Sequence, residues 1–236
     1  MPELPRHLWY LITSLGGAGV TLPLAIAIAL WLALGYTWRM ALGWLVLLGA
    51  AIGVVTVTKL AFLGWGVGVR ELDFTGLSGH AALSTAVYPV ALFVMLLPAR
   101  PKVRAVGVAL GLATGIAVGL SRVVVEAHSP SEAITGCFVG AVTALMFVRW
   151  AWDAEPGRLS ATPVTVSLLT LMVALHGVRL PTQRWVTHIA LKVSGHERPY
   201  IRARWKAGLY DQPNAVPLSR KQNAASAPPV SDERDV

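Results

Sequence analysis

Six long apolar runs constrain the fold of this chain more than any other feature of its sequence. A helix needs about 20 predominantly apolar residues to cross the hydrocarbon core of a bilayer, because each residue advances it by only about 1.5 Å. Segments in lipid must also satisfy their backbone hydrogen bonds internally, which favours helices. The sequence therefore predicts an all-α integral membrane protein, a six-helix bundle with spans at residues 18–34, 40–63, 79–97, 103–120, 131–148 and 163–178.

Composition supports a membrane protein rather than a soluble domain. Charged residues make up 14% of the 236 residues and hydrophobic residues 55%, with a mean hydropathy of +0.59. A soluble domain carries roughly 25% charged residues. The formal net charge is +8, but the basic residues cluster between and after the apolar runs, where they fit membrane topology and anionic headgroups better than nucleic acid. We therefore expect membrane lipids, and no nucleic acid, as partners.

Three segments follow from the distribution of apolar residues. Residues 1–17 are predicted to form an interfacial segment, residues 18–181 the six-span membrane domain, and residues 182–236 a basic polar tail that is partly disordered. Within the tail, residues 184–195 have the pattern of an amphipathic surface helix. Its basic residues either attract acidic lipid headgroups or form a solvated face.

The short loops predict the orientation of the bundle. The segment from Pro98 to Arg104 is strongly basic and is expected on the cytoplasmic side. Counting spans then places the turns after the second and the fourth span on the extracytoplasmic side. Six spans also place the basic tail on that side. Because long segments follow the positive-inside rule weakly, the short loops carry more weight.

Both extracytoplasmic turns contain side chains suited to a tetrahedral anion. Arginine forks match phosphate oxygens and lysine adds a point charge, while N–H groups at a helix start add further donors. Two histidines can divide the chemistry, because a neutral imidazole can attack phosphorus while a protonated one donates to the leaving alcohol. The residues concerned are Lys59, Arg70, Ser78, Gly79 and His80 in the first turn, and Ser121, Arg122, His128 and Glu132 in the second.

Two stretches resemble motifs of the type 2 phosphatidic acid phosphatase (PAP2) superfamily. The third motif of that family, S-R-x5-H-x3-D, is similar to SRVVVEAHSPSE at residues 121–132, with Glu132 in place of the aspartate. The second motif, P-S-G-H, is similar to LSGH at residues 77–80, with Leu77 in place of the proline. Their order and their common side of the membrane agree with the family.

The first motif of the family, K-x6-R-P, is incomplete in this chain. Lys59 fits the lysine, but Gly66 stands where the arginine belongs, and the nearest arginine is Arg70. The resemblance covers residues 59 to about 140, and the six-span layout agrees with it.

The resemblance implies a phosphohistidine mechanism without metal or cofactor. His128 would be the nucleophile, His80 would protonate the departing oxygen, and Glu132 would orient His128. The phosphate would be held by Lys59, Arg70, Ser78, Gly79, Ser121 and Arg122.

Several of these residues also have structural interpretations. Glu132 completes a capping box in SPSE, residues 129–132, and this role can coexist with orienting the histidine. Lys59 could extend from the end of its span to the interface. Arg70 could pair with a neighbouring carboxylate and serve the structure alone.

The sequence thus predicts a membrane phosphatase for a lipid phosphate or diphosphate, of the phosphatidate or undecaprenyl diphosphate type. It is expected in the bacterial inner membrane with its site on the extracytoplasmic side. Two alternatives stay open: a lipid phosphotransferase of the same fold, and a degenerate, non-catalytic protein that binds lipid phosphates. The sequence identifies neither the lipid nor the oligomeric state.

Overall fold

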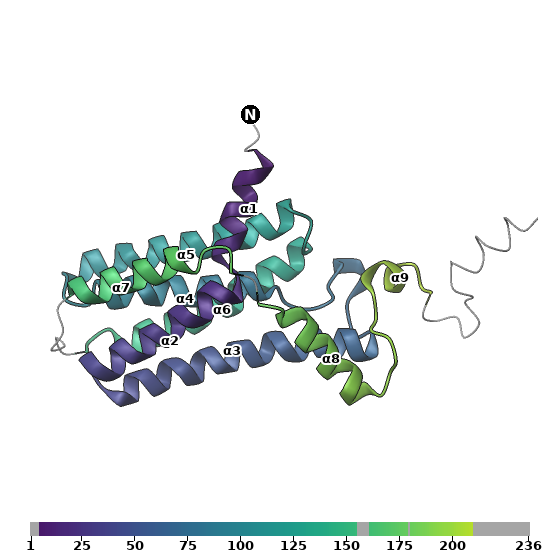
Figure 1. Ribbon diagram of the computed structural model, residues 1–236, viewed down its shortest axis with the longest axis horizontal. Helices are drawn as coiled ribbons and strands as arrows, with labels where there is room; N and C mark the ends of the chain where they lie inside the picture. The colour runs from purple at the N-terminus through teal and green to yellow at the C-terminus, as the bar shows by residue number, and fades with distance from the viewer. Residues whose placement is uncertain (1–4, 155–160, 179, 210–236) are drawn as a thin grey trace, which may run out of the picture. The chain divides into compact units, whose positions relative to one another are not determined.

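The computed structural model describes residues 5–154, 161–178 and 180–209, which are helical apart from turns, loops and one isolated bridge between Val69 and Phe74. The chain divides into two compact units, one ending at Pro199 and one beginning at Tyr200. Residues from 210 onward, where a disordered tail is predicted, lie outside the described residues. The first unit contains α1 (Arg6–Leu15), α2 (Ala18–Gly35), α3 (Trp38–Trp65), the 3-10 turn η1 (Arg70–Leu72), α4 (Gly79–Met95), α5 (Pro101–Val124), α6 (Pro130–Ala151), α7 (Ala161–Ala174) and α8 (Thr182–Ser194), and the second contains α9 (Arg202–Lys206) (Figure 1).

Helices α2 to α7 coincide with the six predicted apolar runs to within a few residues, which confirms the all-α class. The predicted count of six spans is not confirmed. Four stretches of the described chain are long and apolar enough to cross a membrane: Arg6–Gly35, which comprises α1 and α2, together with α3, α5 and α6. Helix α4 has 17 residues and α7 has 14, about 26 Å and 21 Å at 1.5 Å per residue, short of a hydrocarbon core of about 30 Å.

Local sequence sets the helix ends that surround the predicted site. Helix α3 stops at Gly66, which takes a left-handed φ of 69° that favours glycine. Helix α4 starts after Ser78, whose hydroxyl accepts a hydrogen bond from the backbone N–H of Ala81, an ordinary N-cap. The backbone N–H of Ser78 also donates to the carbonyl of Glu132 at 3.1 Å. This bond joins the start of α4 to the start of α6 and brings the two predicted turns together.

Helix α4 is the centre of the bundle, since it contacts α2, α3, α5, α6 and α7. Small residues on its neighbours allow the backbones to approach closely. Gly115 of α5 faces the backbone of Thr85, and Gly140 of α6 faces the carbonyl of Ala82, so a side chain at either glycine would overlap α4. This packing fixes α4, and with it the position of His80 in its first turn.

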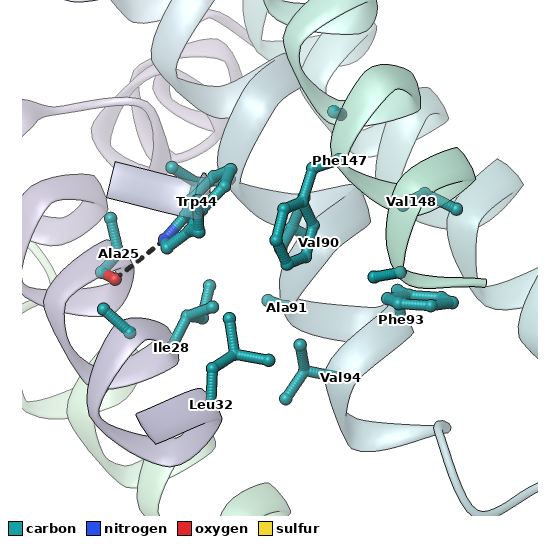
Figure 2. Packing of buried hydrophobic residues seen from close by; sticks show 14 of the residues in the cluster. Ala25, Ile28, Leu32, Trp44, Val90, Ala91, Phe93, Val94, Phe147 and Val148 are labelled. Atoms are coloured by element: carbon teal, nitrogen blue, oxygen red, sulfur yellow. Dashed lines mark hydrogen bonds between the residues drawn. The ribbon is translucent and has the colours of Figure 1, made fainter. Parts of the chain in front are cut away.

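A hydrophobic core fills the part of the bundle away from the two turns. The indole N–H of Trp44 donates to the carbonyl of Ala25 at 3.0 Å, and its ring meets Phe147 edge-on, with ring centroids 5.5 Å apart. Ile28 and Val90 complete the packing around these rings (Figure 2). In a bilayer such contacts stabilise the bundle through close packing rather than through exclusion of water.

The outer surfaces of the long helices carry many exposed apolar side chains. Leu30 on α2, Val57 on α3, Leu110 on α5 and Phe138 on α6 are all more than half exposed. A soluble monomer rarely exposes contiguous apolar surface on this scale. The four long apolar helices and their outer faces therefore fit a membrane protein.

Helices α1 and α8 both lie at the end of the bundle where α3 stops and α4 starts. Helix α1 is fastened there by the hydroxyl of Tyr88, which donates to the carbonyl of Leu15 at 2.7 Å. Helix α8 packs against α3, and Figure 1 shows it crossing the end of that helix. Both ends of the first unit therefore reach the side of the bundle that carries the predicted site.

Candidate active site

The turn between α5 and α6 presents His128. The carbonyl of Arg122 accepts hydrogen bonds from the backbone N–H groups of Ala127 at 3.0 Å and His128 at 3.2 Å, so the chain folds back over the last turn of α5. Glu126 makes this reversal with a φ of 57°, a left-handed conformation uncommon outside glycine, and its side chain is exposed. The turn holds Arg122 and His128 close together.

His128 is paired with a buried carboxylate. Its Nδ1 lies 2.6 Å from Oε2 of Glu132, whose side chain is fully buried. The other carboxylate oxygen, Oε1, accepts hydrogen bonds from the backbone N–H and the hydroxyl of Thr75, at 2.7 and 2.6 Å. A carboxylate only accepts, so this pairing assigns the proton to Nδ1 and leaves the Nε2 lone pair of the neutral ring open.

The capping box predicted for α6 is confirmed. The Ser129 hydroxyl accepts from the backbone N–H of Glu132 at 3.4 Å, and Oε2 of Glu132 accepts from the backbone N–H of Ser129 at 3.3 Å. The same carboxylate therefore caps the helix and contacts His128. The cap fixes the carboxylate, and the carboxylate in turn fixes the imidazole.

Opposing influences set the charge of His128, which lies in the turn outside the helices. Burial is the largest of them and lowers the pKa of His128 from its ordinary value of 6.5. The hydrogen bond and the negative charge of Glu132 raise this pKa, whereas the charges of Lys59 and Arg122 lower it. A lowered pKa keeps the imidazole neutral at neutral pH, which is the form that can act as a nucleophile.

Lys59 lies in front of the first turn of α4. Its Nζ is 4.0 Å from the position that a Cβ would take on Gly79. Ser78 and Gly79 begin the helix at this point, where backbone N–H groups and the helix dipole favour an anion. An anion bound at the start of α4 would therefore meet the ammonium of Lys59 directly.

His80 and Arg122 complete the cluster. The charges of Arg122 and Lys59, and that of His128 when it is protonated, act on the imidazole of His80, whose ring makes no hydrogen bond to another described residue. Among the described residues, Nε of Arg122 has no hydrogen-bond partner, although it is buried. Because buried donors are nearly always satisfied, a buried guanidinium N–H of this kind suits an oxygen acceptor from a ligand.

The cluster suits an anion rather than a metal cation. Lys59 and Arg122 contribute positive charge, while the carboxylate of Glu132 is already occupied by His128 and Thr75. Across the described ranges, no group of three or more His, Cys, Asp or Glu side chains is placed to hold a metal ion.

Two residues predicted to bind phosphate lie in different surroundings. The hydroxyl of Ser121 is fully buried, donates to the carbonyl of Val118 at 2.6 Å, and lies 2.6 Å from the hydroxyl of Thr13. Arg70 is exposed in η1, and its charge is not among those of the described residues that act on either histidine of the cluster. Their part in phosphate binding stays a prediction.

Sequence reasoning misses two contacts of the site. Thr75, in the loop before α4, holds Glu132 through two hydrogen bonds. Gln183 of α8 accepts a hydrogen bond from Nζ of Lys59 at 3.4 Å. Neither residue belongs to a motif, and Gln183 lies in the segment predicted as tail, so no sequence signal marks them.

Comparisons with known proteins give a family match and a relative. A model of the PAP2 superfamily matches residues 66–156, which include α4, α5 and α6. A protein of Klebsiella pneumoniae, described as an uncharacterized 22.5 kDa protein in the cps region, is 39% identical over 201 residues, or 82% of this chain and 95% of that protein. No solved structure matches the chain at a significant level.

Proposed function

Because this chain belongs to the PAP2 superfamily, we propose that it is a membrane phosphatase that hydrolyses a lipid phosphate or diphosphate through a phosphohistidine. Membership of the superfamily indicates phosphatase activity. The observation that carries the finer proposal is the 2.6 Å contact between Nδ1 of His128 and the buried Glu132. It lies beside two cations, Lys59 and Arg122, whose charges act on the same ring.

The substrate phosphate binds between these cations and the start of α4. The guanidinium of Arg122 offers paired N–H donors that match two phosphate oxygens, including the buried Nε–H that lacks a partner among the described residues. Lys59 adds a point charge in front of Gly79. The negative charge of the phosphate offsets both cations and favours the protonated form of His80 that the leaving group requires.

The first chemical step transfers the phosphoryl group to His128. The lone pair of Nε2 forms a bond to phosphorus, and the bond from phosphorus to the lipid oxygen breaks. His80 donates its proton to that oxygen, so the lipid leaves as an alcohol, or as a monophosphate when the substrate is a diphosphate. The phosphorylated ring carries positive charge, which the carboxylate of Glu132 stabilises through Nδ1–H.

The second step releases inorganic phosphate. A water molecule attacks phosphorus from the side vacated by the lipid, and the bond between phosphorus and Nε2 breaks with its electron pair returning to the ring. The neutral His80 left by the first step takes the proton of the water. Both histidines then have their starting charges, and the cycle needs no further group.

We place the site on the extracytoplasmic side of the membrane. Arg100 ends the loop between α4 and α5, and Lys102 and Arg104 lie in the first turn of α5, at the opposite end of that helix from Arg122, and short basic connections face the cytoplasm. A site at the end of an apolar bundle lets the lipid chains stay in the bilayer while the headgroup reaches the histidines. Reaction with an impermeant histidine reagent applied to right-side-out vesicles tests this placement.

Phosphate release by the purified protein in detergent tests the activity. Phosphatidate and undecaprenyl diphosphate are supplied with EDTA present, and wild type is compared with His128→Ala and with His7→Ala, which removes an exposed histidine of α1. We expect release in wild type and in His7→Ala, and a loss of at least about 10³-fold in His128→Ala, because the nucleophile is removed.

Other outcomes identify the alternatives. Transfer of phosphate to an added acceptor alcohol, with little release to water, would identify a phosphotransferase that uses the same phosphohistidine. Binding of inorganic phosphate without turnover of any substrate would identify a degenerate binding protein. Release that is equal in wild type and His128→Ala would contradict the proposed mechanism.

A further inference from the structure

Helix α8 is fixed to the end of α3 by close backbone contacts. Ala190 is fully buried, and a Cβ placed on Gly64 would lie 3.4 Å from the carbonyl oxygen of Ala190 and 3.2 Å from Cβ of Ser194. Beyond the helix, Nδ1–H of His196 donates to the carbonyl of Gly64 at 2.6 Å. That carbonyl lies in the last turn of α3, where helical partners run out. The last two turns of α8 are therefore held firmly.

The first turn of α8 contacts Lys59, one of the residues proposed to bind phosphate. Nζ of Lys59 donates to Oε1 of Gln183 at 3.4 Å, at the long end of the hydrogen-bond range. The same Nζ lies 4.0 Å from the Cβ position of Gly79. The ammonium is therefore close to both the start of α4 and the carboxamide of Gln183.

A glutamine is well suited to this position. An ammonium has three N–H donors, so Gln183 occupies one and leaves two for phosphate oxygens. A neutral carboxamide leaves the positive charge of Lys59 intact, whereas a carboxylate would pair with it and compete with the phosphate. A lysine side chain is also long and flexible, and holding it in place before binding lowers the entropic cost of binding.

At position 66, just after the end of α3, the chain has a glycine, so no side chain there helps to hold the ammonium of Lys59. Gly66 ends the helix in a left-handed conformation, and an arginine there would be strained. The contact from α8 is instead made to Lys59, the residue of the first sequence motif that the chain retains.

We propose that Gln183 is a positioning residue of the phosphate site, which holds the ammonium of Lys59 toward the start of α4. The proposal rests on the proposed function, because it takes the cluster around Lys59 as the place where phosphate binds. Helix α8, although it follows the segment matched by the family, then forms part of the active site.

Substitutions at Gln183 test the proposal in the full-length protein. Gln183→Met keeps the length of the side chain and removes its hydrogen bond, and Gln183→Glu adds a competing negative charge. Thr187→Ala is the matched control, because this threonine lies one turn further along α8 and its hydroxyl bonds the backbone carbonyl of Gln183. The measurements are the Kd of inorganic phosphate by calorimetry, kcat and KM for phosphatidate, and Tm.

The expected results separate positioning from a purely structural role. Gln183→Met weakens phosphate binding about three- to tenfold, the range for loss of one hydrogen bond of ordinary strength, because the contact is long at 3.4 Å. It raises KM by a similar factor and leaves kcat unchanged, because the ammonium contacts phosphate in the ground state and the transition state alike. Gln183→Glu weakens phosphate binding further, and Thr187→Ala leaves Kd, KM and kcat at the wild-type values.

Two results would overturn the proposal: an unchanged phosphate Kd in folded Gln183→Met, or a loss in that variant that only parallels a fall in Tm. The assay also separates this proposal from the proposed function. If wild type binds phosphate but hydrolyses no lipid phosphate, the function fails while the Kd comparison still decides the role of Gln183. If wild type neither binds inorganic phosphate nor releases it from a lipid phosphate, both fail.

Discussion

Helix α5 carries an arginine near each end, and the two side chains have different partners. At one end, Nη1 of Arg104 donates to the carbonyl of Trp152 at 2.8 Å, and its guanidinium lies over the Trp152 ring, 5.0 Å from the centroid. That ring stacks on Phe93 with centroids 5.9 Å apart. At the other end, the side chain of Arg122 makes no hydrogen bond to any described residue and lies with Lys59 and two histidines.

The comparison shows how the same residue type serves two purposes. Arg104 also has a buried Nε without a partner in the described chain. Its Nη1, however, donates to the carbonyl of Trp152, the C-cap of α6, and its guanidinium covers the ring of that residue, which stabilises the structure. Arg122 lies near a second cation, Lys59, which is unfavourable in the protein alone. We infer that Arg104 supports stability and Arg122 supports anion binding, and the predictions below test this division.

The largest effect is expected from Glu132→Gln, at the site end. The variant keeps an acceptor for Thr75 but removes the charge that fixes the His128 tautomer, so kcat should fall by about 10³- to 10⁴-fold. The carboxylate raises the pKa of His128, and its loss lowers that pKa. Since His128 must be neutral to react, the acidic limb of kcat/KM should move to lower pH.

A pH–rate profile with one substrate checks this shift. The ionisation of the substrate is the same for both enzymes, so the difference between their acidic limbs reports on His128. A limb that stays in place, or moves to higher pH, would contradict the pairing of His128 with Glu132.

Arg122→Ala should come next in size. It removes the paired donors for phosphate, and kcat/KM should fall by about 10²- to 10³-fold, the range found for loss of one preorganised donor group. The Tm should stay the same or rise, because the substitution removes the repulsion between Arg122 and Lys59. Arg122→Lys should restore little of the activity, since an ammonium cannot form the paired contact. A large fall in Tm for Arg122→Ala would contradict the inference that Arg122 supports anion binding rather than stability.

Arg104→Ala should show the opposite pattern. Loss of the bond to Trp152 and of the ring contact should destabilise the protein by about 1–3 kcal/mol and lower its Tm. The kcat/KM measured well below that Tm should stay near the wild-type value. Parallel thermal and kinetic measurements on Arg104→Ala and Arg122→Ala therefore test the comparison directly. A kinetic loss as large as that of Arg122→Ala would show that Arg104 also acts on the site.

The local geometry around the predicted site residues follows from the sequence, because the spacing of these residues sets the ends of the helices. Ser129 and Glu132 are a capping pair at fixed helical spacing, so the position of the carboxylate relative to His128 follows from the sequence between them. The start of α4 at Ser78 is equally local. The bounds of the helices along the chain follow from the lengths of the apolar runs. Helix α4 nevertheless falls short of a full span, because the apolar run continues beyond the residue at which the helix ends.

Contacts between distant segments are not predicted, for a physical reason. Thr75 reaches Glu132 across 57 residues and Gln183 reaches Lys59 across 124. Both are ordinary polar residues in loop or helix-start positions, and no local pattern distinguishes them from solvated neighbours. Their partners are set by how α3, α4, α6 and α8 pack, which depends on the whole bundle.

Ser121→Ala should have the smallest effect. A hydroxyl has one proton, and Ser121 gives it to the carbonyl of Val118, which leaves its oxygen to accept from Thr13 of α1. Loss of the hydrogen bond between the Ser121 and Thr13 hydroxyls should lower the free energy of unfolding by about 1 kcal/mol and change kcat/KM by less than about threefold. Thr13→Val removes the same hydrogen bond by deleting the other hydroxyl, so the two single variants and the double variant should have equal Tm. If Ser121→Ala instead loses activity about 100-fold while Thr13→Val does not, the hydroxyl must turn from Val118 to the phosphate during turnover, and the role indicated by the third motif would hold for Ser121 as well.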